Sequence, residues 1–448
     1  MSFVPHTTED RKEMLGAIGA NSVEELFSVI PESVRFPKLD LPPTLSEMEA
    51  NRKLNQLAAK NVNTAANPSF LGAGIYNHYS PATVYQILWR GEYHTAYTPY
   101  QPEVAQGTLQ VIYEFQSMIA ALTNMDVANA SLYDGATAMA EGALLAVNPR
   151  KKRTKVVVAG TVHPHYRDVL RTYTTGLDIE VVELPIPDDT MLNDPNAFDE
   201  HLDDSTACLI VQYPNFFGRI EDLKTVSQKA HDAGARFVVS TYPLALGMLP
   251  PPGDFDADIV TGEGQSLGVP QSLGGPVVGI LAAKQDLVRQ LPGRLAGMSV
   301  DEEGKRGYVL ALQTREQHIR REKATSNICT NQGLLALAAT VYLSSVGPTG
   351  LKKIAEMCYQ NAHYLADQID AIDGFEVVGD GKFFNEFAVK TPIPVRDLNR
   401  KLQAAGIVGG YDLAKVDPAL ENTMLICATE MNNKEQITEL IAALKAAA

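Results

Sequence analysis

Apolar residues in the middle of the chain gather in short continuous runs that alternate with amphipathic stretches. The runs predict buried strands at KVVVAG (155–160), IEVVELP (179–185), ACLIVQYP (207–214), RFVVSTY (236–242), ADIVTG (257–262) and VVGIL (277–281). Helical spacing between them, as in DLKTVSQKAHDAGA (222–235), favours a mostly parallel sheet with helices on both faces. Such sheets bind ligands at the carboxyl ends of their strands, so the residues that follow each strand are the first site candidates.

The N-terminal pattern is different. SVEELFSVI (22–30) has apolar residues at helical spacing and is followed by Pro31, and a polar helix begins near Thr44 or Ser46. We interpret residues 1–60 as a helical extension or arm, because this pattern supplies too few apolar positions for a core of its own.

The pattern changes again near residue 331. Two helices are expected, an apolar one at NQGLLALAATVYLSSVG (331–347) and an amphipathic one at GLKKIAEMCYQNAHYLADQI (350–369). Short strands FEVVG (375–379), NEFAVK (385–390) and TMLICAT (423–429) follow, with the helix RDLNRKLQAAG (396–406) among them. The sequence therefore predicts a large α/β domain (61–330) and a smaller α+β C-terminal domain (331–448).

Charge and cysteine content narrow the classes of partner. The chain has 53 acidic against 38 basic residues, a net charge of −15, which argues against nucleic acid and against an anionic membrane surface. No apolar run approaches the ~20 residues that span a bilayer, and the N-terminus lacks an apolar signal core. The four scattered cysteines are expected to be buried, reduced thiols, and a cytoplasmic location follows.

Two stretches offer polar groups after predicted strands. Asp134, Gly135, Ala136 and Thr137 could open a helix whose free N–H groups bind a phosphate, or Asp134 could simply cap that helix. In GTVHPHYRDVLRTY (160–173), His163 is placed to lie over an aromatic cofactor ring. No nearby cysteine or acid completes a metal set with His163 and His165, so no metal site is expected.

Two further stretches are open to more than one interpretation. Asn215 ends a strand and could face a ligand or form a structural turn. The loop within residues 91–116 is rich in aromatic and polar groups, a composition that suits a cleft or a subunit interface, although an ordinary buried loop is also possible. Its candidate residues are Tyr97, Thr98, Tyr100, Gln101 and Glu103.

The stretch GEGQSLGVPQSLGGP (262–276) resembles the turn that, in pyridoxal phosphate enzymes, carries the cofactor lysine. Gln265 and Ser266 occupy this turn, and the sequence has no lysine between Lys229 and Lys284. Pyridoxal chemistry also needs an acid beside the ring nitrogen, so that the ring accepts electrons. The strand that ends at Tyr242 supplies no acid there.

Several motifs together resemble the P-protein family of the glycine cleavage system, glycine decarboxylase, and in particular the N-terminal subunit of its two-chain form. The resemblance covers essentially the whole chain. The motifs are FVPHTTEDRKEML (3–15), ELFSVIP (25–31), FLGAGIYNHYSPATV (70–84), TAYTPYQPEVAQGTLQVIYEFQ (95–116), MDVANASLYDGATAMAE (125–141) and GEGQSLGVPQSLGGP (262–276).

The resemblance implies the aspartate-aminotransferase-like fold, pyridoxal phosphate fold type I. It implies that this chain binds no cofactor covalently, and that pyridoxal phosphate is held by a lysine of the homologous C-terminal subunit 2 in an α2β2 assembly. The complete enzyme decarboxylates glycine and passes the aminomethyl group to the lipoyl arm of the H-protein.

By the resemblance, Gln265 lies at the Schiff-base lysine position and Tyr242 near the ring-nitrogen acid position, so the chain has no catalytic residue of its own. A vestigial cofactor cleft is expected to contain Asp134, Gly135, Ala136, Thr137, His163, Asn215, Gln265 and Ser266. The loop 95–103 and the extension are candidates for lining the partner's working site or wrapping the partner.

Two other interpretations stay open. The chain could be a self-sufficient pyridoxal enzyme with a displaced lysine, either Lys284, expected to point away from the cleft, or Lys323, near the domain junction. It could also be a non-catalytic scaffold or regulator that keeps the fold only for association.

Overall fold

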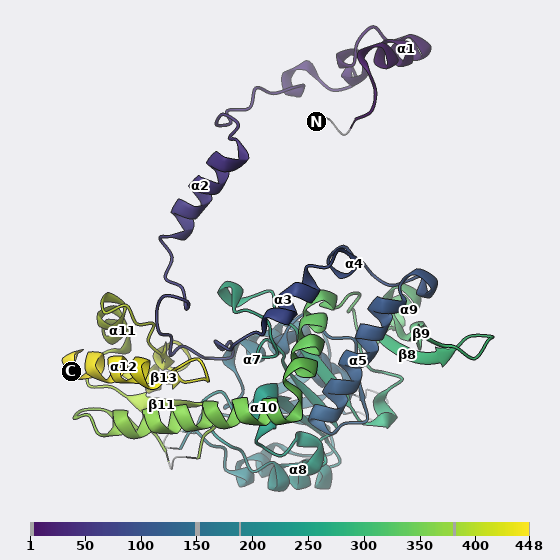
Figure 1. The fold of residues 1–448 in the computed structure, drawn as a ribbon. Coiled ribbons are helices and arrows are strands. Elements are labelled where there is room, and N and C mark those ends of the chain that lie inside the picture. The colour runs from purple at the N-terminus through teal and green to yellow at the C-terminus, as the bar shows by residue number, and fades with distance from the viewer. Residues whose placement is uncertain (1–3, 148–152, 188–189, 380–381, 448) are drawn as a thin grey trace. The chain divides into compact units, whose positions relative to one another are not determined.

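The structure is a computed structural model that describes residues 4–147, 153–187, 190–379 and 382–447, so residues 1–3 of the predicted extension lie outside it. Figure 1 shows the course of the chain, which divides into two compact units, one ending at Val62 and the other beginning at Asn63.

The first unit consists of short helices joined by extended segments. They are α1 (Thr8–Ile18), η1 (Glu24–Phe27), η2 (Glu32–Val34) and α2 (Glu47–Ala58). Thr7 and Ser46 begin α1 and α2 with reciprocal capping boxes, which resolves the choice between Thr44 and Ser46. The helix expected over 22–30 is only a 3₁₀ turn, and α1 was not predicted. Across residues 4–62 no described side chain is buried.

The second unit is built on a seven-stranded sheet in the order β1-β7-β6-β5-β4-β2-β3. All six predicted strands are present. The bounds are β1 (Val127–Ala128), β2 (Lys155–Val158), β3 (Glu180–Glu183), β4 (Thr206–Tyr213), β5 (Arg236–Thr241), β6 (Ile259–Glu263) and β7 (Gly279–Ala283). Strands β2 to β6 pair in parallel, and β7 is antiparallel to both neighbours.

Helices cover both faces of this sheet, as the continuous apolar runs predict. One face packs on α6 (Gly135–Ala146), α7 (Pro164–Thr174) and α8 (Leu223–Asp232), and the other on α5 (Gln106–Thr123) and α10 (Gly333–Asp370). Side chains alternate between the two layers along β7, where Leu281 joins the first core and Ile280 the second.

Helix α10 combines the two helices expected over 331–347 and 350–369. It is interrupted at Gly347, whose φ of 60° and ψ of −179° are not helical, directly before Pro348. Among the described helices, α10 alone has the length and apolar composition of a membrane span. Its apolar half lies in the core instead, where Ala336, Ala339 and Tyr342 pack against α5 and the sheet.

The C-terminal residues form a four-stranded antiparallel sheet in the order β10-β11-β13-β12. Its strands are β10 (Glu376–Val377), β11 (Glu386–Lys390), β12 (Tyr411–Asp412) and β13 (Thr423–Cys427), of which β12 was not predicted. Helices α11 (Val395–Ala404) and α12 (Lys434–Ala447) pack on it through Leu398, Leu402 and Leu440.

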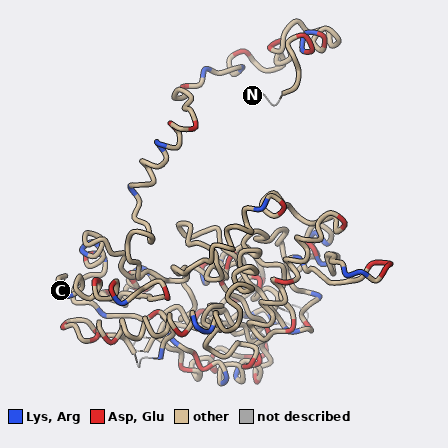
Figure 2. Tube along the Cα trace, in the orientation of Figure 1, with Lys and Arg blue, Asp and Glu red and all other residues tan. Residues whose placement is uncertain are grey.

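A two-stranded hairpin of β8 (Leu295–Val300) and β9 (Arg306–Ala311) was also not predicted. Its turn carries acidic and basic residues side by side, as Figure 2 shows. The remaining α-helices are α3 (Ala82–Leu88), α4 (Gly91–His94) and α9 (Gln317–Arg320). The 3₁₀ turns of the second unit include η3 (Pro102–Val104), η6 (Pro243–Gly247) and η11 (Arg321–Lys323).

The cysteines are all free thiols, and the expectation that all four are buried was wrong for one of them. Cys208, Cys358 and Cys427 are buried, whereas Cys329 is exposed. Cys329 lies in the connection between η11 and α10, next to Ile328, which is buried in the core.

Candidate functional site

The carboxyl edge of the large sheet brings together most of the predicted cleft residues. His163 follows β2, Tyr242 follows β5 and Gln265 follows β6, so parallel strands place the three side chains at one edge. All three are buried.

Gln265 is fully engaged with backbone groups of Tyr76 and Val269. Its Oε1 accepts from the Tyr76 amide (2.9 Å), and its Nε2 donates to the Tyr76 carbonyl (3.0 Å) and to the Val269 carbonyl (2.8 Å). The amide side chain thus acts as a clamp between the turn after β6 and a residue 189 positions away in the sequence.

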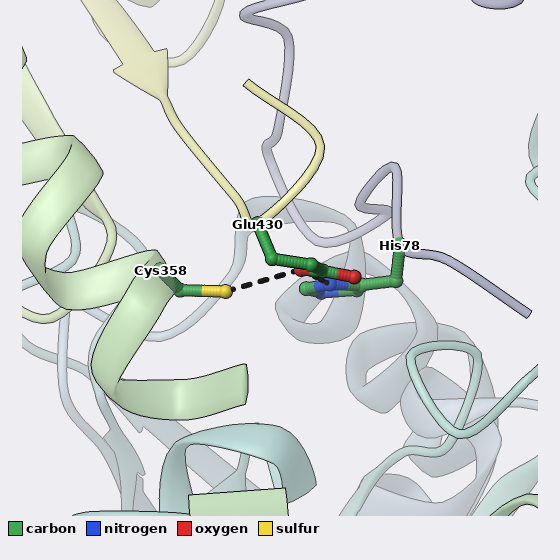
Figure 3. A group of neighbouring side chains, drawn as sticks. All are labelled: His78, Cys358 and Glu430. Carbon is green, nitrogen blue, oxygen red and sulfur yellow. Dashed lines mark hydrogen bonds and ion pairs between the residues drawn. The ribbon is translucent and has the colours of Figure 1, made fainter. Parts of the chain in front are cut away.

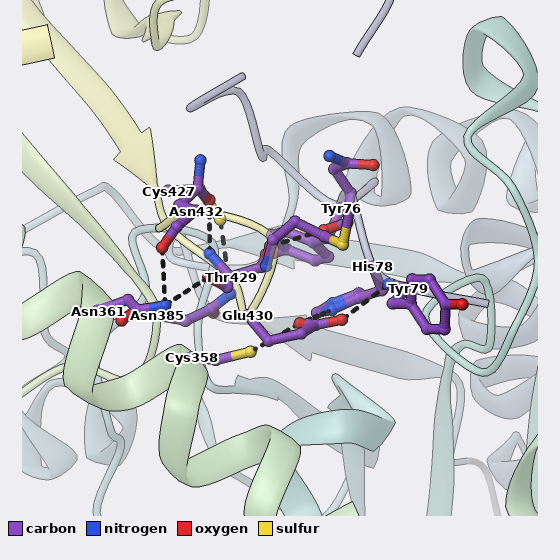
Figure 4. Close-up of polar contacts among 12 residues, drawn as sticks. Tyr76, His78, Tyr79, Cys358, Asn361, Asn385, Cys427, Thr429, Glu430 and Asn432 are labelled. Atoms are coloured by element: carbon purple, nitrogen blue, oxygen red, sulfur yellow. Dashed lines mark hydrogen bonds and ion pairs between the residues drawn. The ribbon is translucent and has the colours of Figure 1, made fainter. Parts of the chain in front are cut away.

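Tyr242 contacts one end of a row of polar side chains, of which Figure 4 shows Tyr76, His78 and Glu430. Its ring packs at a tilt against Tyr76 with 4.4 Å between centroids, and its hydroxyl forms a short hydrogen bond with His78 Nε2. His78 Nδ1 in turn contacts a carboxylate oxygen of Glu430 at 2.7 Å. Burial raises the pKa of Glu430, but His78 and hydrogen bonds outweigh that effect and leave its pKa below the ordinary value.

His78, Glu430 and Cys358 form a group that sequence reasoning missed (Figure 3). One possible ligand atom from each lies within 4.8 Å of the others, a spacing that a metal ion could use. Cys358 Sγ donates to Glu430 at 3.3 Å. The three groups therefore satisfy one another as a hydrogen-bonded chain, which does not require an ion.

His163 is fixed by two backbone groups. Its Nε2 is 3.0 Å from the Ala73 carbonyl and its Nδ1 accepts from the His165 amide at 3.1 Å. Its ring stacks on Tyr166 with 4.6 Å between centroids. Burial lowers the pKa of His163 to about 4, so the imidazole is neutral at pH 7.

The N-terminus of α6 is capped by two carboxyl groups. Asp134 is the N-cap and accepts from the Thr137 amide at 2.7 Å, which is the capping alternative left open by the sequence. Glu263, at the end of β6, accepts from the Gly135 amide at 2.9 Å. Burial raises the pKa of Glu263 to about 8, and its backbone hydrogen bonds oppose that rise. Ala136, in the same turn, is half-buried.

Asn215 forms a structural turn. Its Nδ2 donates to the Met191 carbonyl and to Glu221 Oε1 (2.8 Å each), and its Oδ1 accepts from the amides of Phe217 and Arg219 (3.0 Å each). These internal bonds use the amide completely, so the ligand-facing alternative does not hold. Ser266 is buried beside Gln265 and its hydroxyl has no hydrogen-bond partner among the described residues.

The segment 73–79, which sequence reasoning did not place in the cleft, contacts almost every predicted position. Ala73 N–H donates to Glu386 Oε1 (2.6 Å) and the Tyr76 hydroxyl to Glu386 Oε2 (2.9 Å). Burial raises the pKa of Glu386 to about 7. The sequence signals there were a run of polar and aromatic residues, GIYNHY (74–79), inside the predicted large domain, and its place within the family motif FLGAGIYNHYSPATV (70–84).

The candidates for a partner site lie elsewhere in the second unit. Tyr97, Tyr100, Gln101 and Glu103 are exposed and Thr98 is half-buried. Tyr97 and Thr98 line a cavity of about 170 Å³. The other lining residues include Tyr93, His94, Pro99, Thr108, Thr330 and Asn331. The loop is therefore not an ordinary buried loop.

Lys284, one of the two alternative lysines, lies at the opposite edge of the sheet from the turn that contains Gln265. Lys284 follows β7 and pairs with Asp256 (2.7 Å) and Asp258 (3.2 Å) at the amino end of β6, whereas Gln265 follows its carboxyl end. Lys323 is an exposed residue of η11.

Comparisons with known proteins agree on one family. The model of the family described as glycine cleavage system P-protein matches residues 1–444. A relative from Thermomicrobium roseum, called probable glycine dehydrogenase (decarboxylating) subunit 1, is 62% identical over 447 residues, covering 100% of both chains. A relative of the same description from Anoxybacillus flavithermus is 52% identical and covers 98% of this chain and 97% of its own.

Solved structures give the same result. A crystal structure of glycine decarboxylase (P-protein) of the glycine cleavage system, in inhibitor-bound form, has a TM-score of 0.92 and 43% identity over 100% of both chains. A sphingosine-1-phosphate lyase of Burkholderia pseudomallei, 15% identical with a TM-score of 0.67 over 93% of this chain and 94% of its own, shares the fold alone. The expected pyridoxal phosphate fold type I is confirmed, and the chain belongs to the glycine cleavage system P-protein family.

Proposed function

We propose that this chain is subunit 1 of a two-chain glycine decarboxylase, in which the homologous C-terminal subunit 2 carries pyridoxal phosphate on its own lysine. The family match over the whole chain supports the reaction. One observation supports the assignment of the cofactor to the partner: the residue after β6 is Gln265, and its side-chain amide is hydrogen-bonded to the backbone of Tyr76. An amide forms no Schiff base, so the chain alone is expected to be inactive.

The loop 95–103 is proposed to complete the partner's active site. In the described structure it projects Tyr97, which is 91% exposed, and Tyr100, which is 53% exposed. Large aromatic side chains with this exposure are typical of protein interfaces. The cavity that Tyr97 and Thr98 line is smaller than most small-molecule sites. Closure by a second chain would make it part of a larger cleft.

The proposed assembly is α2β2, and its substrates are glycine and the lipoyl H-protein. The cofactor in the partner supplies an electron-accepting ring for the loss of carbon dioxide. This chain supplies shape and contacts around that ring and excludes water from one side of it. The assembly is proposed to bind neither nucleic acid nor a membrane. It is proposed to lie in the cytoplasm.

The test is an exchange of labelled bicarbonate into glycine with H-protein present. The chain alone is expected to give no exchange and no borohydride-trapped pyridoxal adduct, while the chain mixed with its homologous subunit 2 is active. Trapping of a lysine adduct in the chain alone would support the self-sufficient alternative. Full activity of subunit 2 without this chain would instead support the scaffold interpretation.

The role of the loop is tested by Tyr97→Ala combined with Thr98→Ala. We expect kcat/KM of the mixed subunits to fall at least about tenfold, because loss of a positioning contact misaligns the reacting groups. Tyr364→Ala removes an exposed tyrosine of the distal half of α10 and is the matched control. Equal activity of both variants, with unchanged folding by circular dichroism, would contradict the proposed role.

A further inference from the structure

The position that a cofactor phosphate would use is occupied by a side chain of the protein. The sequence predicts a phosphate-binding position at the first turn of α6, a helix of 12 residues. Glu263 reaches it from the end of β6. Its Oε2 accepts from the Gly135 amide (2.9 Å), and its Oε1 accepts from the amides of Gln265 (2.9 Å) and Val278 (3.1 Å). Three backbone donors thus converge on one buried carboxyl group.

The space around this group is closed. An added methyl group on Gly135 would overlap the Tyr166 hydroxyl and would lie 2.9 Å from Glu263 Cβ. A second amide of the same turn, that of Thr137, is bonded to the Asp134 side chain. A phosphate group, which is larger than a methyl group, has neither the volume nor the free donors to bind at Gly135.

The position of a cofactor ring is occupied as well. The Tyr76 ring packs against Tyr242, the residue at the ring-nitrogen acid position. The backbone N–H and C=O of Tyr76 are both hydrogen-bonded to the side-chain amide of Gln265. The Ala73 carbonyl is hydrogen-bonded to Nε2 of His163, the residue expected to lie over a cofactor ring. Each of the three ring-contacting positions is therefore bonded to, or packed against, the segment 73–79.

We propose that this cleft is closed from within, with Glu263 as a built-in replacement for the cofactor phosphate and the segment 73–79 as a replacement for the cofactor ring. The residues present do not fit pyridoxal phosphate, and the chain folds without it. This inference goes beyond the proposed function, because it concerns the isolated chain and does not depend on glycine, H-protein or subunit 2.

The test is chemical rescue of Glu263→Ala in the full chain. The truncation leaves a cavity the size of an acetate ion, lined by the amides of Gly135, Gln265 and Val278. We expect acetate, and to a smaller extent inorganic phosphate, to raise the melting temperature of this variant by several degrees more than that of the wild type, because a ligand that binds only the folded state stabilises it. The comparison with the wild type removes the general stabilisation that such salts give.

Glu263→Gln is the matched control, since it keeps the volume and leaves no cavity, so neither ion should stabilise it beyond the wild type. Its amide also places an N–H group against Gly135, and hydrogen exchange at the Gly135 amide is expected to become at least about tenfold faster. This second measurement decides the matter if the alanine variant does not fold.

Two results would overturn the proposal. One is a Glu263→Ala variant whose melting temperature responds to acetate and phosphate no more than the wild type does, together with unchanged exchange at Gly135 in Glu263→Gln. The other is saturable binding of pyridoxal phosphate by the wild-type chain, seen as a shift of the cofactor's absorbance. Neither result bears on whether the mixed subunits decarboxylate glycine, so the two proposals fail separately.

Discussion

A single proton separates the two states of His163, and the contacts around it select the neutral one. Nδ1 accepts from the His165 amide, and Nε2 faces the Ala73 carbonyl, which can only accept. The neutral tautomer with its proton on Nε2 satisfies both partners. A second proton on Nδ1 would place two donors opposite each other, and burial would leave the charge without water.

This state makes the stability of the chain depend on pH. The pKa of His163 is lowered to about 4 in the folded chain, against about 6.5 when unfolded. A lowered histidine pKa contributes stability above pH ~6.5 that is lost as the pH falls toward 4, about 3 kcal/mol in all. We expect His163→Gln to flatten this part of the stability curve, measured by urea unfolding at a series of pH values.

The exposed neighbour His165 offers the control, since His165→Gln should leave the slope between pH ~6.5 and 4 as it is in the wild type. A wild-type slope retained by His163→Gln would mean that other groups carry the acid sensitivity. In that case the tautomer inferred from the Ala73 and His165 contacts would lose its support.

At the scale of elements, one glycine lets the turn after β4 approach the C-terminal sheet. Gly218 has a φ of 80°, and a methyl group there would overlap the backbone carbonyl of Glu386 in β11. Its own carbonyl accepts from the Phe384 amide at 3.1 Å. The turn and the strand are thus joined backbone to backbone, with no room for a side chain between them.

Gly218→Ala is therefore expected to lower the free energy of unfolding by at least about 2 kcal/mol, because it adds a steric overlap to a strained φ. Gly176→Ala is the matched control: its φ is 81° and nothing lies within 4 Å of the added group. It should cost only the backbone strain, about 1 kcal/mol. Equal losses for the two variants in urea unfolding would show that the contact with Glu386 is unimportant.

The elements that sequence reasoning found are those whose pattern is local. Strands β2 and β4 to β7 are continuous apolar runs, and the residues that follow the parallel strands β2, β5 and β6 lie at one edge, as expected for a parallel sheet. The hairpin β8–β9 was missed because LAGMSV and RGYVLA mix glycine with apolar residues and lack regular alternation. The contents of the cleft were missed for another reason. Tyr76 is hydrogen-bonded to Gln265, 189 positions away in the sequence, and to Glu386, 310 positions away. No local sequence pattern predicts contacts at such separations.

At the scale of the whole chain, the two units use their apolar residues differently. The unit beginning at Asn63 buries them in cores around both sheets. The unit ending at Val62 exposes them, and even the ring contact between Phe27 and Phe36, 5.3 Å between centroids, leaves both side chains exposed. Its exposed apolar residues include Met14, Ile18, Val29, Leu39, Leu41, Met48, Leu54 and Leu57. An exposed apolar set of this size is typical of a surface that binds another protein.

A chain that begins at Asn63 tests whether the extension serves the partner and not the fold. Because the buried apolar cores lie in the unit that begins at Asn63, we expect this truncated chain to keep the melting temperature of the full chain to within about 2 °C. Mixed with subunit 2, it should bind at least about tenfold more weakly by ultracentrifugation, because the apolar residues of the extension would no longer be covered by the partner.

The control is a full-length chain with Val29→Ser and Leu41→Ser, which keeps the extension but removes two of its most exposed apolar side chains, 89% and 72% exposed. Weaker binding by both proteins would assign the affinity to apolar contact and not to chain length. A truncated chain that unfolds at a much lower temperature, or one that binds subunit 2 with undiminished affinity, would refute the role proposed for residues 1–62, since the exposed apolar surface would then have no partner to account for it.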